Sequence, residues 1–522
     1  MRYWAMMATL AVVQPAQAQR VAVEETSVAA VQADMTAGRT SAERLTRAYL
    51  DRIAAIDRKG PTLRSVIAVN PHAVAQARAL DAERRAGQVR GPLHGVPVLV
   101  KDNIDTAENA TTAGSLALKD NFTRRDAPLV GRLRAAGAVI LGKTNLSEWA
   151  NIRSTASMSG WSAVGGLVRN PYALDRSACG SSSGTGAAIA ASLAVVGVGT
   201  ETDGSVVCPA AMNGLVGLKP TVGLVSRTHI VPISHSQDTA GPMARSVRDA
   251  AALFSAMIGS DPADAATADA DRHRRDYAAT LNAGALKGLR IGVLRPDMSD
   301  DLGDRFDAAL AVLKAAGAVL VDVERPKTDG MAAAEFDVLK MELKTDLAAY
   351  LATTPPAVTV RTLADVIAFN RANAAAEMPY FAQEIFEQAE ATGGTADKGY
   401  AEARAKSFRL ASEAIDTMLA KGDVRLIVSP SYGAPWLSDS VHGDQFAGPS
   451  ASALPAISGY PHLTVPMGLV DGLPVGLSFF STRWTEGLLL NAGHAFEQAG
   501  AMRVAPTYPA SVDAGAGLDG VR

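Results

Sequence analysis

Three segments of the chain place a lysine or serines where they could do chemistry. They are VPVLVKDNID (96–105), CGSSSGTGAA (179–188) and GTETDGSVVCPA (199–210). A serine hydroxyl is a weak nucleophile and needs a base to take its proton. A buried lysine can be that base, because burial lowers its pKa from a reference value near ~10.4 and leaves a neutral amine. These segments suggest nucleophilic catalysis, provided that the fold brings them together.

Lys101 follows a proline and apolar residues that indicate a buried strand. Lysines are rarely fully buried unless something compensates their charge. A lysine at a strand end can also extend its amine to water, or pair with Asp102 or Asp105. From this segment alone, such a structural role is favoured over a catalytic one.

The middle segment has three serines (181–183) between glycines, directly before an alanine-rich helix. Hydroxyls and backbone N–H groups at a helix N-terminus suit a polar or negative group, although they also form ordinary caps. Gly180-x-Ser182-x-Gly184 matches the nucleophile elbow of α/β-hydrolases, which requires a preceding strand. The residues before it, VRNPYALDRSA (168–178), indicate a loop instead. No Gly-Lys-Ser/Thr follows, which argues against a phosphate loop.

Ser205 comes after the apolar run AVVGVGT (194–200), at the predicted end of a buried strand. Gly204 permits a tight turn because it has no Cβ to clash. Successive N–H groups of Thr202, Asp203 and Gly204 could then point at one spot and form an oxyanion hole beside the Ser205 hydroxyl. No histidine that could act as the base lies close in sequence.

Strand and helix patterns alternate along most of the chain. Helix–Gly–strand units occur at 129–145 and 309–323, and further strand candidates are 95–102, 193–200, 289–294, 425–431, 462–468 and 476–481. This alternation predicts an α/β fold, a single large domain whose mixed, mostly parallel sheet is covered by helices on both faces. Residues 331–421 show few strand signals, so we expect a mostly helical insertion or cap there. A helix over 40–57 is predicted to begin with a capping box, Thr40-x-x-Glu43.

The charge balance and the spacing of the histidines bear on which partners and metals the protein could bind. The 522 residues include 50 lysines and arginines against 53 aspartates and glutamates, for a formal net charge of −3. This balance gives no reason to expect nucleic acid or an anionic membrane as a partner. The eight histidines are scattered without metal-ligand spacing, so no metal site is predicted. Oligomeric state cannot be read from these patterns.

The N-terminus reads MRYWAMMATLAVVQPAQAQR, with an early arginine, a short apolar run over 4–13 and small residues in AQA. This pattern is typical of a secretory signal peptide over 1–18, cleaved after Ala18, and the apolar run is too short to span a bilayer. We therefore expect a secreted or periplasmic protein with its mature domain over 19–522. An unstructured start is the alternative.

The chain has two cysteines, Cys179 and Cys208, one in each serine-bearing segment. In an oxidising compartment they could pair. Buried free thiols are the alternative, and the sequence alone favours them, because two cysteines cannot staple a fold of this size.

Taken together, these segments resemble the amidase signature family. The resemblance rests on GVPVLVKDNID, CGSSSGTGAA, GTETDGSVVCPAAMNGLVGLKPT and SQDTAGPMARSVRDAA (236–251), with RLRAAGAVILGKTN and LPAISGYPHLTVPMGL in agreement. It extends from about residue 25 to about residue 500. TETDGS and LDRSACGSSSG are most similar to the peptide amidase branch, whose members remove the C-terminal amide of peptides.

The resemblance implies a triad of Lys101, Ser181 and Ser205. Ser205 would be the nucleophile, Ser181 a bridging serine in a cis peptide, and neutral Lys101 the base. Aligning the family's glycine- and serine-rich segment on the alanine-rich helix selects Ser181, while a slip of one residue would give Ser182 that role. Backbone N–H groups from Thr202 onward would hold the oxyanion. The resemblance implies no cofactor.

Two departures from the common family pattern stand beside the nucleophile. Asp203-Gly204 precede Ser205 where Gly-Gly is usual, and Val207 stands in the place of an arginine. Asp203 either shapes the site of the leaving group or is a turn residue whose backbone matters.

We expect a secreted amidase that cleaves a carboxamide, such as the C-terminal amide of a peptide, to an acid and ammonia through an acyl-enzyme. An amidase or esterase of aryl or aliphatic amides and esters is the alternative. A glutamine-amidase component of a tRNA-dependent transamidation complex fits poorly with export, because that reaction is cytoplasmic. A non-catalytic binding protein on the same scaffold and an α/β-hydrolase that uses Ser182 are the remaining hypotheses.

Overall fold

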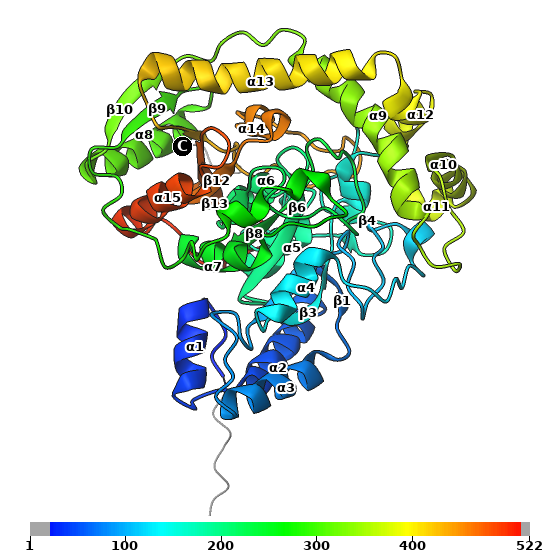
Figure 1. The fold of residues 1–522 in the computed structure, drawn as a ribbon, viewed down its shortest axis with the longest axis horizontal. Coiled ribbons are helices and arrows are strands. Elements are labelled where there is room, and N and C mark those ends of the chain that lie inside the picture. Colours follow the sequence, from blue (N-terminus) through cyan, green and yellow to red (C-terminus); the bar gives the residue numbers. More distant parts are fainter. Residues whose placement is uncertain (1–20, 513–522) are drawn as a thin grey trace, which may run out of the picture.

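The computed structural model describes residues 21–512, whose fold is shown in Figure 1. The expected signal peptide over 1–18 lies outside the described residues. Within 21–512, no helix is both long and apolar enough to cross a bilayer.

One eleven-stranded sheet runs through the molecule in the order β1-β3-β2-β6-β8-β7-β12-β13-β11-β9-β10. In chain order its strands are β1 (Val66–Val69), β2 (Pro97–Lys101), β3 (Val139–Thr144), β6 (Val196–Glu201), β7 (Val216–Lys219), β8 (Thr239–Ala244), β9 (Arg290–Leu294), β10 (Val319–Val323), β11 (Leu426–Pro430), β12 (His462–Val470) and β13 (Leu473–Phe480). A separate two-stranded sheet pairs β4 (Trp161–Ser162) with β5 (Gly166–Leu167).

Parallel pairing is confined to two blocks of the large sheet, β3-β2-β6 and β11-β9-β10. The strands between these blocks pair antiparallel, and so does β1 at the edge. The predicted α/β fold with one mixed sheet flanked by helices is confirmed. The mostly parallel pairing that we predicted holds inside the two blocks, while antiparallel neighbours such as β12 and β13 build the middle.

Helices flank the sheet along its length (Figure 1). They are α1 (Val28–Thr36), α2 (Ala42–Arg52), α3 (Ala73–Arg85), α4 (Pro128–Ala135), α5 (Ser183–Ala190), α6 (Val207–Met212), α7 (Val247–Met257), α8 (Asp300–Ala315), α14 (Ala453–Ser458) and α15 (Glu486–Gly500). Every residue of β2 and β6 is buried. Strands buried on both faces are expected to be continuous apolar runs, which is why these two were recognisable in the sequence.

The remaining helices follow one another between β10 and β11. They are α9 (Met331–Leu351), α10 (Leu363–Ala372), α11 (Ala374–Glu377), α12 (Glu384–Glu390) and α13 (Tyr400–Gly422). A second apolar core, separate from that of the sheet, includes Leu343 and Leu347 of α9 and Phe386 of α12. Val231 and Ile233, from the segment between β7 and β8, belong to the same core. These helices therefore pack on a segment that also lines the site described below.

Some elements differ from the sequence-based expectation. The strands β1, β7 and β8 were not predicted, and β8 contains Gly241 and Pro242, which are rare inside strands. The helix expected over 40–57 begins at Ala42, where the Ser41 side chain accepts a hydrogen bond from the Arg44 N–H. Ser41, rather than Thr40, is therefore its N-cap residue.

The position of the site follows from the parallel block β3-β2-β6. Val100 of β2 pairs with Val198 of β6, so the two strands end at the same edge of the sheet. In open α/β sheets, ligands bind outside the carboxyl ends of the parallel strands. Lys101 ends β2, and the turn of Thr202 to Ser205 follows β6 at this edge.

Candidate active site

The Lys101 amine lies at the end of β2 in a fully buried position. Its Nζ donates a hydrogen bond to Ser181 Oγ at 2.7 Å. It also donates to Thr200 Oγ1 at 2.8 Å and to the Thr200 carbonyl oxygen at 3.2 Å. Two of the three predicted triad residues are therefore in direct contact, and Thr200, which the sequence did not single out, completes the surroundings of the amine.

Burial lowers the pKa of Lys101 from 10.5 to about 7, against the opposing attraction of Asp238 and Glu201. The neighbouring acids do not neutralise this lysine. Asp102 pairs with Lys143 at 2.9 Å, and Asp105 pairs with Arg125 at 2.8 Å. The structural alternative, in which Lys101 pairs with Asp102 or Asp105 or reaches water, is therefore wrong.

The serine-rich segment carries the one cis peptide bond among residues 21–512, between Gly180 and Ser181. The Ser181 carbonyl oxygen accepts a hydrogen bond from the Ser147 N–H at 3.1 Å. A Cβ at position 180 would collide with Ser147 Oγ, so only glycine fits there. These contacts hold the Ser181 hydroxyl toward Lys101.

Ser182 faces the backbone of β6 and not an open site. Its hydroxyl donates to the Thr200 carbonyl oxygen at 3.0 Å and accepts from the Thr200 N–H at 3.2 Å. The side chain is fully buried, and residues 168–178 before it form turns and loop without a strand. A nucleophile elbow centred on Ser182 is therefore wrong, because it lacks both the preceding strand and an exposed hydroxyl.

Ser205 lies in the turn between β6 and α6, with 8% of its surface exposed. Its carbonyl oxygen accepts a hydrogen bond from the Ser182 N–H at 3.1 Å, which joins the two serine-bearing segments directly. Gly204 has φ +75°, and a Cβ there would collide with Tyr432 Oη. The glycine is required both by the backbone conformation and by the approach of the tyrosine.

The turn leaves backbone donors unused. Within 21–512, the N–H groups of Thr202, Asp203, Gly204 and Ser205 donate no hydrogen bond to the protein. The next two, of Val206 and Val207, both donate to the Glu201 carboxylate, at 2.7 and 2.9 Å. Glu201 therefore anchors the end of the turn, while the preceding donors remain available to a negatively charged oxygen.

Residues 227–238, which we name the rim loop, form the later part of the connection from β7 to β8 and were given no role from the sequence. Asp238 accepts from the Thr202 hydroxyl at 2.5 Å and from the backbone N–H groups of Ile233 and Ser234. Burial raises the pKa of Asp238 to about 6. The Gln237 amide donates to the Thr202 carbonyl oxygen at 3.3 Å. The rim loop thus supports the turn that carries Ser205.

A cavity of about 420 Å³ opens between the rim loop and α9. Thr200 and Thr202 line this cavity, whereas Lys101 and the two serines do not. Thr200 Oγ1 accepts a hydrogen bond from Lys101, and Thr202 begins the turn that carries Ser205. The apolar lining of the cavity comes from 230–233, from Ala349 and Tyr350 of α9, and from Ala150 and Ala263. Charged side chains such as Arg227 and Asp264 also line it. The cavity can therefore hold an apolar group next to the candidate catalytic residues.

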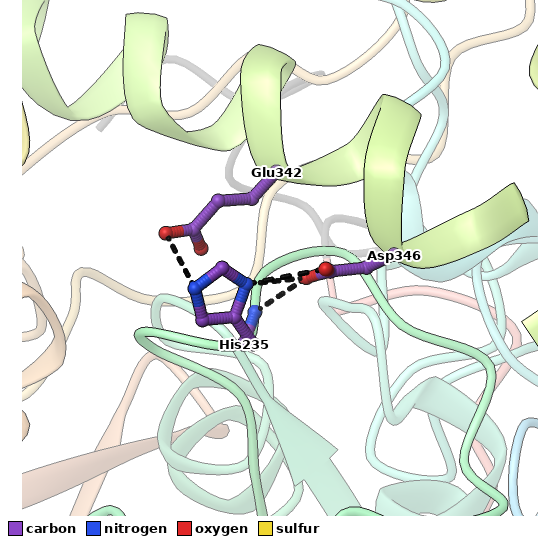
Figure 2. A group of neighbouring side chains, drawn as sticks. All are labelled: His235, Glu342 and Asp346. Atoms are coloured by element: carbon purple, nitrogen blue, oxygen red, sulfur yellow. Dashed lines mark hydrogen bonds and ion pairs between the residues drawn. The ribbon is translucent and has the colours of Figure 1, made fainter. Parts of the chain in front are cut away.

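His235 ties the rim loop to α9, as Figure 2 shows. Its Nδ1 lies 2.9 Å from Asp346 Oδ2, and its Nε2 lies 3.4 Å from Glu342 Oε1. These are the groups within 21–512 that come close enough to share a metal ion. However, the two carboxylates lie at opposite ring nitrogens, and Glu342 already accepts from Tyr400 and Ser234. The arrangement is that of a hydrogen-bonded link between the loop and the helix.

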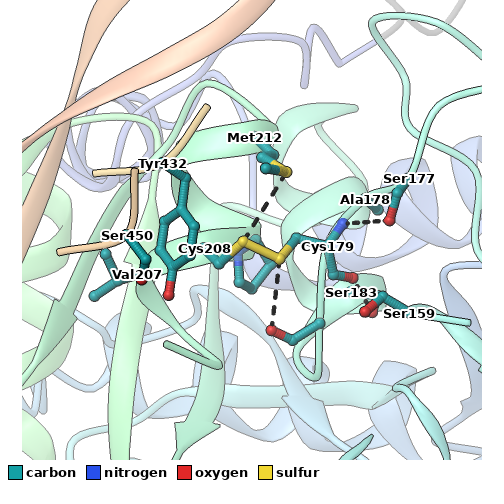
Figure 3. Close-up of a disulfide and its surroundings, with 12 residues drawn as sticks. Ser159, Ser177, Ala178, Cys179, Ser183, Val207, Cys208, Met212, Tyr432 and Ser450 are labelled. Carbon is teal, nitrogen blue, oxygen red and sulfur yellow. Dashed lines mark hydrogen bonds between the residues drawn. A yellow bond between two sulfur atoms is a disulfide. The ribbon is translucent and has the colours of Figure 1, made fainter. Parts of the chain in front are cut away.

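Cys179 and Cys208 form a disulfide, shown in Figure 3. Their Cα atoms lie 6.0 Å apart, and both residues are buried. The preference for free thiols was therefore wrong. That preference considered only stapling of the whole fold, whereas the bridge joins two local segments that the fold already brings into contact.

Comparisons with known proteins agree with this geometry. The Amidase family model matches residues 44–490. The structure of the peptide amidase PAM in complex with the competitive inhibitor chymostatin is 52% identical, has a TM-score of 0.90, and covers 93% of this chain and 99% of that chain. A probable amidase of Arabidopsis thaliana is 38% identical over 498 residues, 93% of this chain and 92% of that protein. One component of the glutamyl-tRNA(Gln) amidotransferase of Pseudomonas syringae pv. syringae is 37% identical over 476 residues, 88% of this chain and 94% of that protein.

The mixed sheet, its flanking helices and these similarities define an enzyme that hydrolyses amide bonds. The expected resemblance is thereby confirmed over most of the chain. The chain belongs to the amidase family.

Proposed function

We propose that this enzyme hydrolyses a carboxamide through an acyl-enzyme on Ser205, with Ser181 as proton relay and Lys101 as base. One observation carries the proposal: the fully buried Lys101 amine lies 2.7 Å from Ser181 Oγ, and no carboxylate of residues 21–512 forms an ion pair with it. A lysine whose pKa is lowered to about 7 is largely neutral in mildly alkaline solution and can accept a proton.

The proposed reaction has two halves, acylation of Ser205 and hydrolysis of the acyl-enzyme. The Lys101 amine takes the Ser181 hydroxyl proton while Ser181 takes that of Ser205, and Ser205 Oγ bonds to the amide carbon. The free N–H groups from Thr202 onward stabilise the negative oxygen. The relay then returns a proton to the leaving nitrogen, the C–N bond breaks, and ammonia leaves. Water repeats the attack on the ester and releases the acid.

Asp203 is the candidate for binding the leaving nitrogen of the amide. Its Oδ1 is buried without a hydrogen-bond partner, in the turn directly before Gly204 and Ser205. A primary amide nitrogen carries two hydrogens and needs acceptors for both, whereas an ester oxygen carries none. We propose that Asp203 accepts one of these hydrogens, which favours primary amides over esters. Asp203→Ala, which removes this acceptor, is then expected to lower kcat/KM for amides more than for esters of the same acid.

We propose the C-terminal amide of a peptide as the substrate. The support is the 52% identity to a peptide amidase and the apolar cavity beside the turn, which suits a side chain of the acyl part. We further propose that the helices of residues 331–421 cap this cavity, since α9 supplies part of its wall. Aryl or aliphatic amides and esters are the second candidate, because the apolar lining would also accept them.

We propose that the protein is exported, by a signal peptide over 1–18 cleaved after Ala18, to a periplasm-like compartment or to the outside. The support is the N-terminal pattern together with a disulfide, which persists in oxidising compartments. Export argues against a role in a tRNA-dependent amidotransferase, despite the 37% identity to a component of one. Detection of the mature N-terminus at Gln19 in a periplasmic fraction tests this, and a full-length cytoplasmic chain would contradict it.

A substrate panel tests the function. Peptide amides, aliphatic amides and aryl esters are assayed with the wild type and with Ser205→Ala, Lys101→Ala and Ser182→Ala. We expect the wild type to prefer peptide amides. Loss of Ser205 or Lys101 should lower kcat by at least about 10³-fold, while Ser182→Ala should only impair it. An active Ser205→Ala variant would refute the mechanism, and a wild type inactive on the whole panel would revive the binding-protein hypothesis.

A further inference from the structure

We infer that the Cys179–Cys208 disulfide is a positioning device for catalysis, which fixes the relay serine Ser181 relative to the nucleophile Ser205. The inference rests on the proposed function of these two serines. Cys179 stands two residues before Ser181, and Cys208 stands three residues after Ser205. The bridge therefore connects the two segments whose relative position the proton relay requires.

At Cys179, the disulfide constrains the backbone directly before the Gly180–Ser181 cis peptide. The Cys179 carbonyl oxygen accepts a hydrogen bond from Ser183, and its N–H donates to Ser177 Oγ at 3.0 Å. Cys179 has φ +58°, in the left-handed region that non-glycine residues rarely adopt. Both partners of its backbone belong to the same short segment. Without the disulfide, these local hydrogen bonds orient Cys179 only relative to its own neighbours.

On the other side, the bridge holds the turn of the nucleophile. The Cys208 N–H donates to the Gly204 carbonyl oxygen at 2.7 Å, which closes the turn around Ser205. Cys208 lies in the first turn of α6, directly after the residues whose N–H groups bind Glu201. A shift of Cys208 would therefore move the turn that presents Ser205 and its free backbone donors.

Besides the disulfide, hydrogen bonds join the two segments. The Ser182 N–H donates to the Ser205 carbonyl oxygen, and the Ser182 hydroxyl bonds the backbone of Thr200 at the end of β6. The Asn213 amide joins Ala178 to the far end of α6, because its Nδ2 donates to both the Ala178 and Pro209 carbonyl oxygens. The disulfide is the covalent link at the near end of α6, beside both serines.

Aromatic and apolar side chains enclose the bridge. Tyr432, Val207 and Met212 form an apolar cluster with both cysteines, and Met212 Sδ lies 4.0 Å from Cys208 Sγ (Figure 3). Reduction by a small dithiol breaks the sulfur–sulfur bond. Two electrons and two protons pass to the cysteines, which become thiols, and the dithiol is oxidised to its own disulfide. Because both cysteines are buried, reduction of the folded enzyme is expected to be slow.

The test compares Cys179→Ala, Cys208→Ala and the double variant with the wild type. If the bridge acts as one unit, each single variant should lose as much activity as the double variant. We expect kcat to fall by about 10- to 100-fold with KM nearly unchanged, because displacement of a reacting group by ~1 Å costs up to about 10²-fold. Met212→Leu, which packs on the bridge without changing it, is the matched control and should keep the wild-type kcat.

Two readouts separate positioning from folding. Active sites are titrated with a serine-directed phosphonate, and the rate of labelling is measured well below the unfolding midpoint of each variant. The wild type is also reduced by a dithiol, its thiols are counted, and activity is followed through reduction and reoxidation. We expect folded, reduced enzyme to be labelled about 10- to 100-fold more slowly and to recover on reoxidation.

The outcomes are distinct. Labelling of the wild type at a residue other than Ser205 would refute the proposed function itself. Labelling at Ser205 at the wild-type rate in the variants or the reduced enzyme would overturn the positioning role alone. Variants or reduced enzyme that unfold, but whose remaining folded fraction keeps the wild-type kcat per titrated site, would assign the bridge to stability and also overturn the inference.

Discussion

Lowering the pH should switch off this enzyme by protonating one buried amine. Burial lowers the pKa of Lys101 from 10.5 to about 7. At pH 8 about nine-tenths of the enzyme would then hold a neutral amine, and at pH 6 about one-tenth. We expect kcat/KM to fall about tenfold between these values and about tenfold for each further unit downward. The assay is ammonia release from a peptide amide across pH 5 to 10, with a neutral substrate so that only the enzyme titrates.

The pH at which activity falls depends on the burial of Lys101, because burial sets its pKa. A lysine with its pKa at 10.5 would be only about 0.3% neutral at pH 8, and the rate would still rise tenfold per unit above pH 8. A profile that keeps rising to pH 10 would therefore refute the reasoning, as would a flat one. In the Ser205→Ala variant, residual activity should lose this pH dependence, which serves as the control for substrate or buffer effects.

The substitution Asp238→Asn tests the direction in which a nearby charge shifts the pKa of Lys101. Asp238 attracts the charged form of Lys101 and so opposes the lowering of its pKa. Asp238→Asn keeps an oxygen that can accept from the Thr202 hydroxyl, but removes the negative charge. The acidic limb of the profile should therefore move to lower pH. Movement to higher pH would show that the titrating group is not a lysine amine.

Three further substitutions test the surroundings. Ser182→Ala removes the hydroxyl that bonds the end of β6, so the free energy of unfolding should fall by about 1 kcal/mol with a partial loss of kcat; complete inactivity, as in Ser205→Ala, would contradict this role. Gly204→Ala forces a Cβ against Tyr432 at φ +75°, so we expect loss of activity and a thermal midpoint lowered by about 1 °C for each kcal/mol of a loss of about 1–3 kcal/mol; normal kcat would show that the turn tolerates a side chain. His235→Ala cuts the link between the rim loop and α9, so KM should rise more than kcat falls; steady-state kinetics showing the reverse would place this loop in the chemistry.

The sequence was most informative where burial and local geometry leave few choices. The apolar runs of β2 and β6 predicted buried strands, and Gly204 predicted a tight turn, because each rests on a local requirement of the backbone. The strand β8 was missed, since its residues TAGPMA lack the β-branched pattern and its place is set by neighbours on both sides.

In the candidate site, too, residues in local motifs could be named from the sequence, and residues whose roles depend on distant contacts could not. Lys101, Ser181 and Ser205 could be named as candidates from the sequence because each stands in a recognisable motif. Asp238 and the His235 link could not, because their roles come from contacts with residues far along the chain, such as Thr202 and α9. The disulfide was misjudged for a similar reason: the distance between its cysteines is a property of the folded chain.

The cavity wall supplied by α9 has a consequence for how such enzymes diversify. Lys101 and the two serines stand on β2 and on the segments around β6, whereas Ala349 and Tyr350 reach the cavity from a helical excursion inserted between β10 and β11. The residues proposed for bond cleavage and this part of the cavity wall thus come from different segments of the chain. Transplanting residues 331–421 from a homologue should exchange the preferred acyl group in a chimera while preserving the rate of bond cleavage.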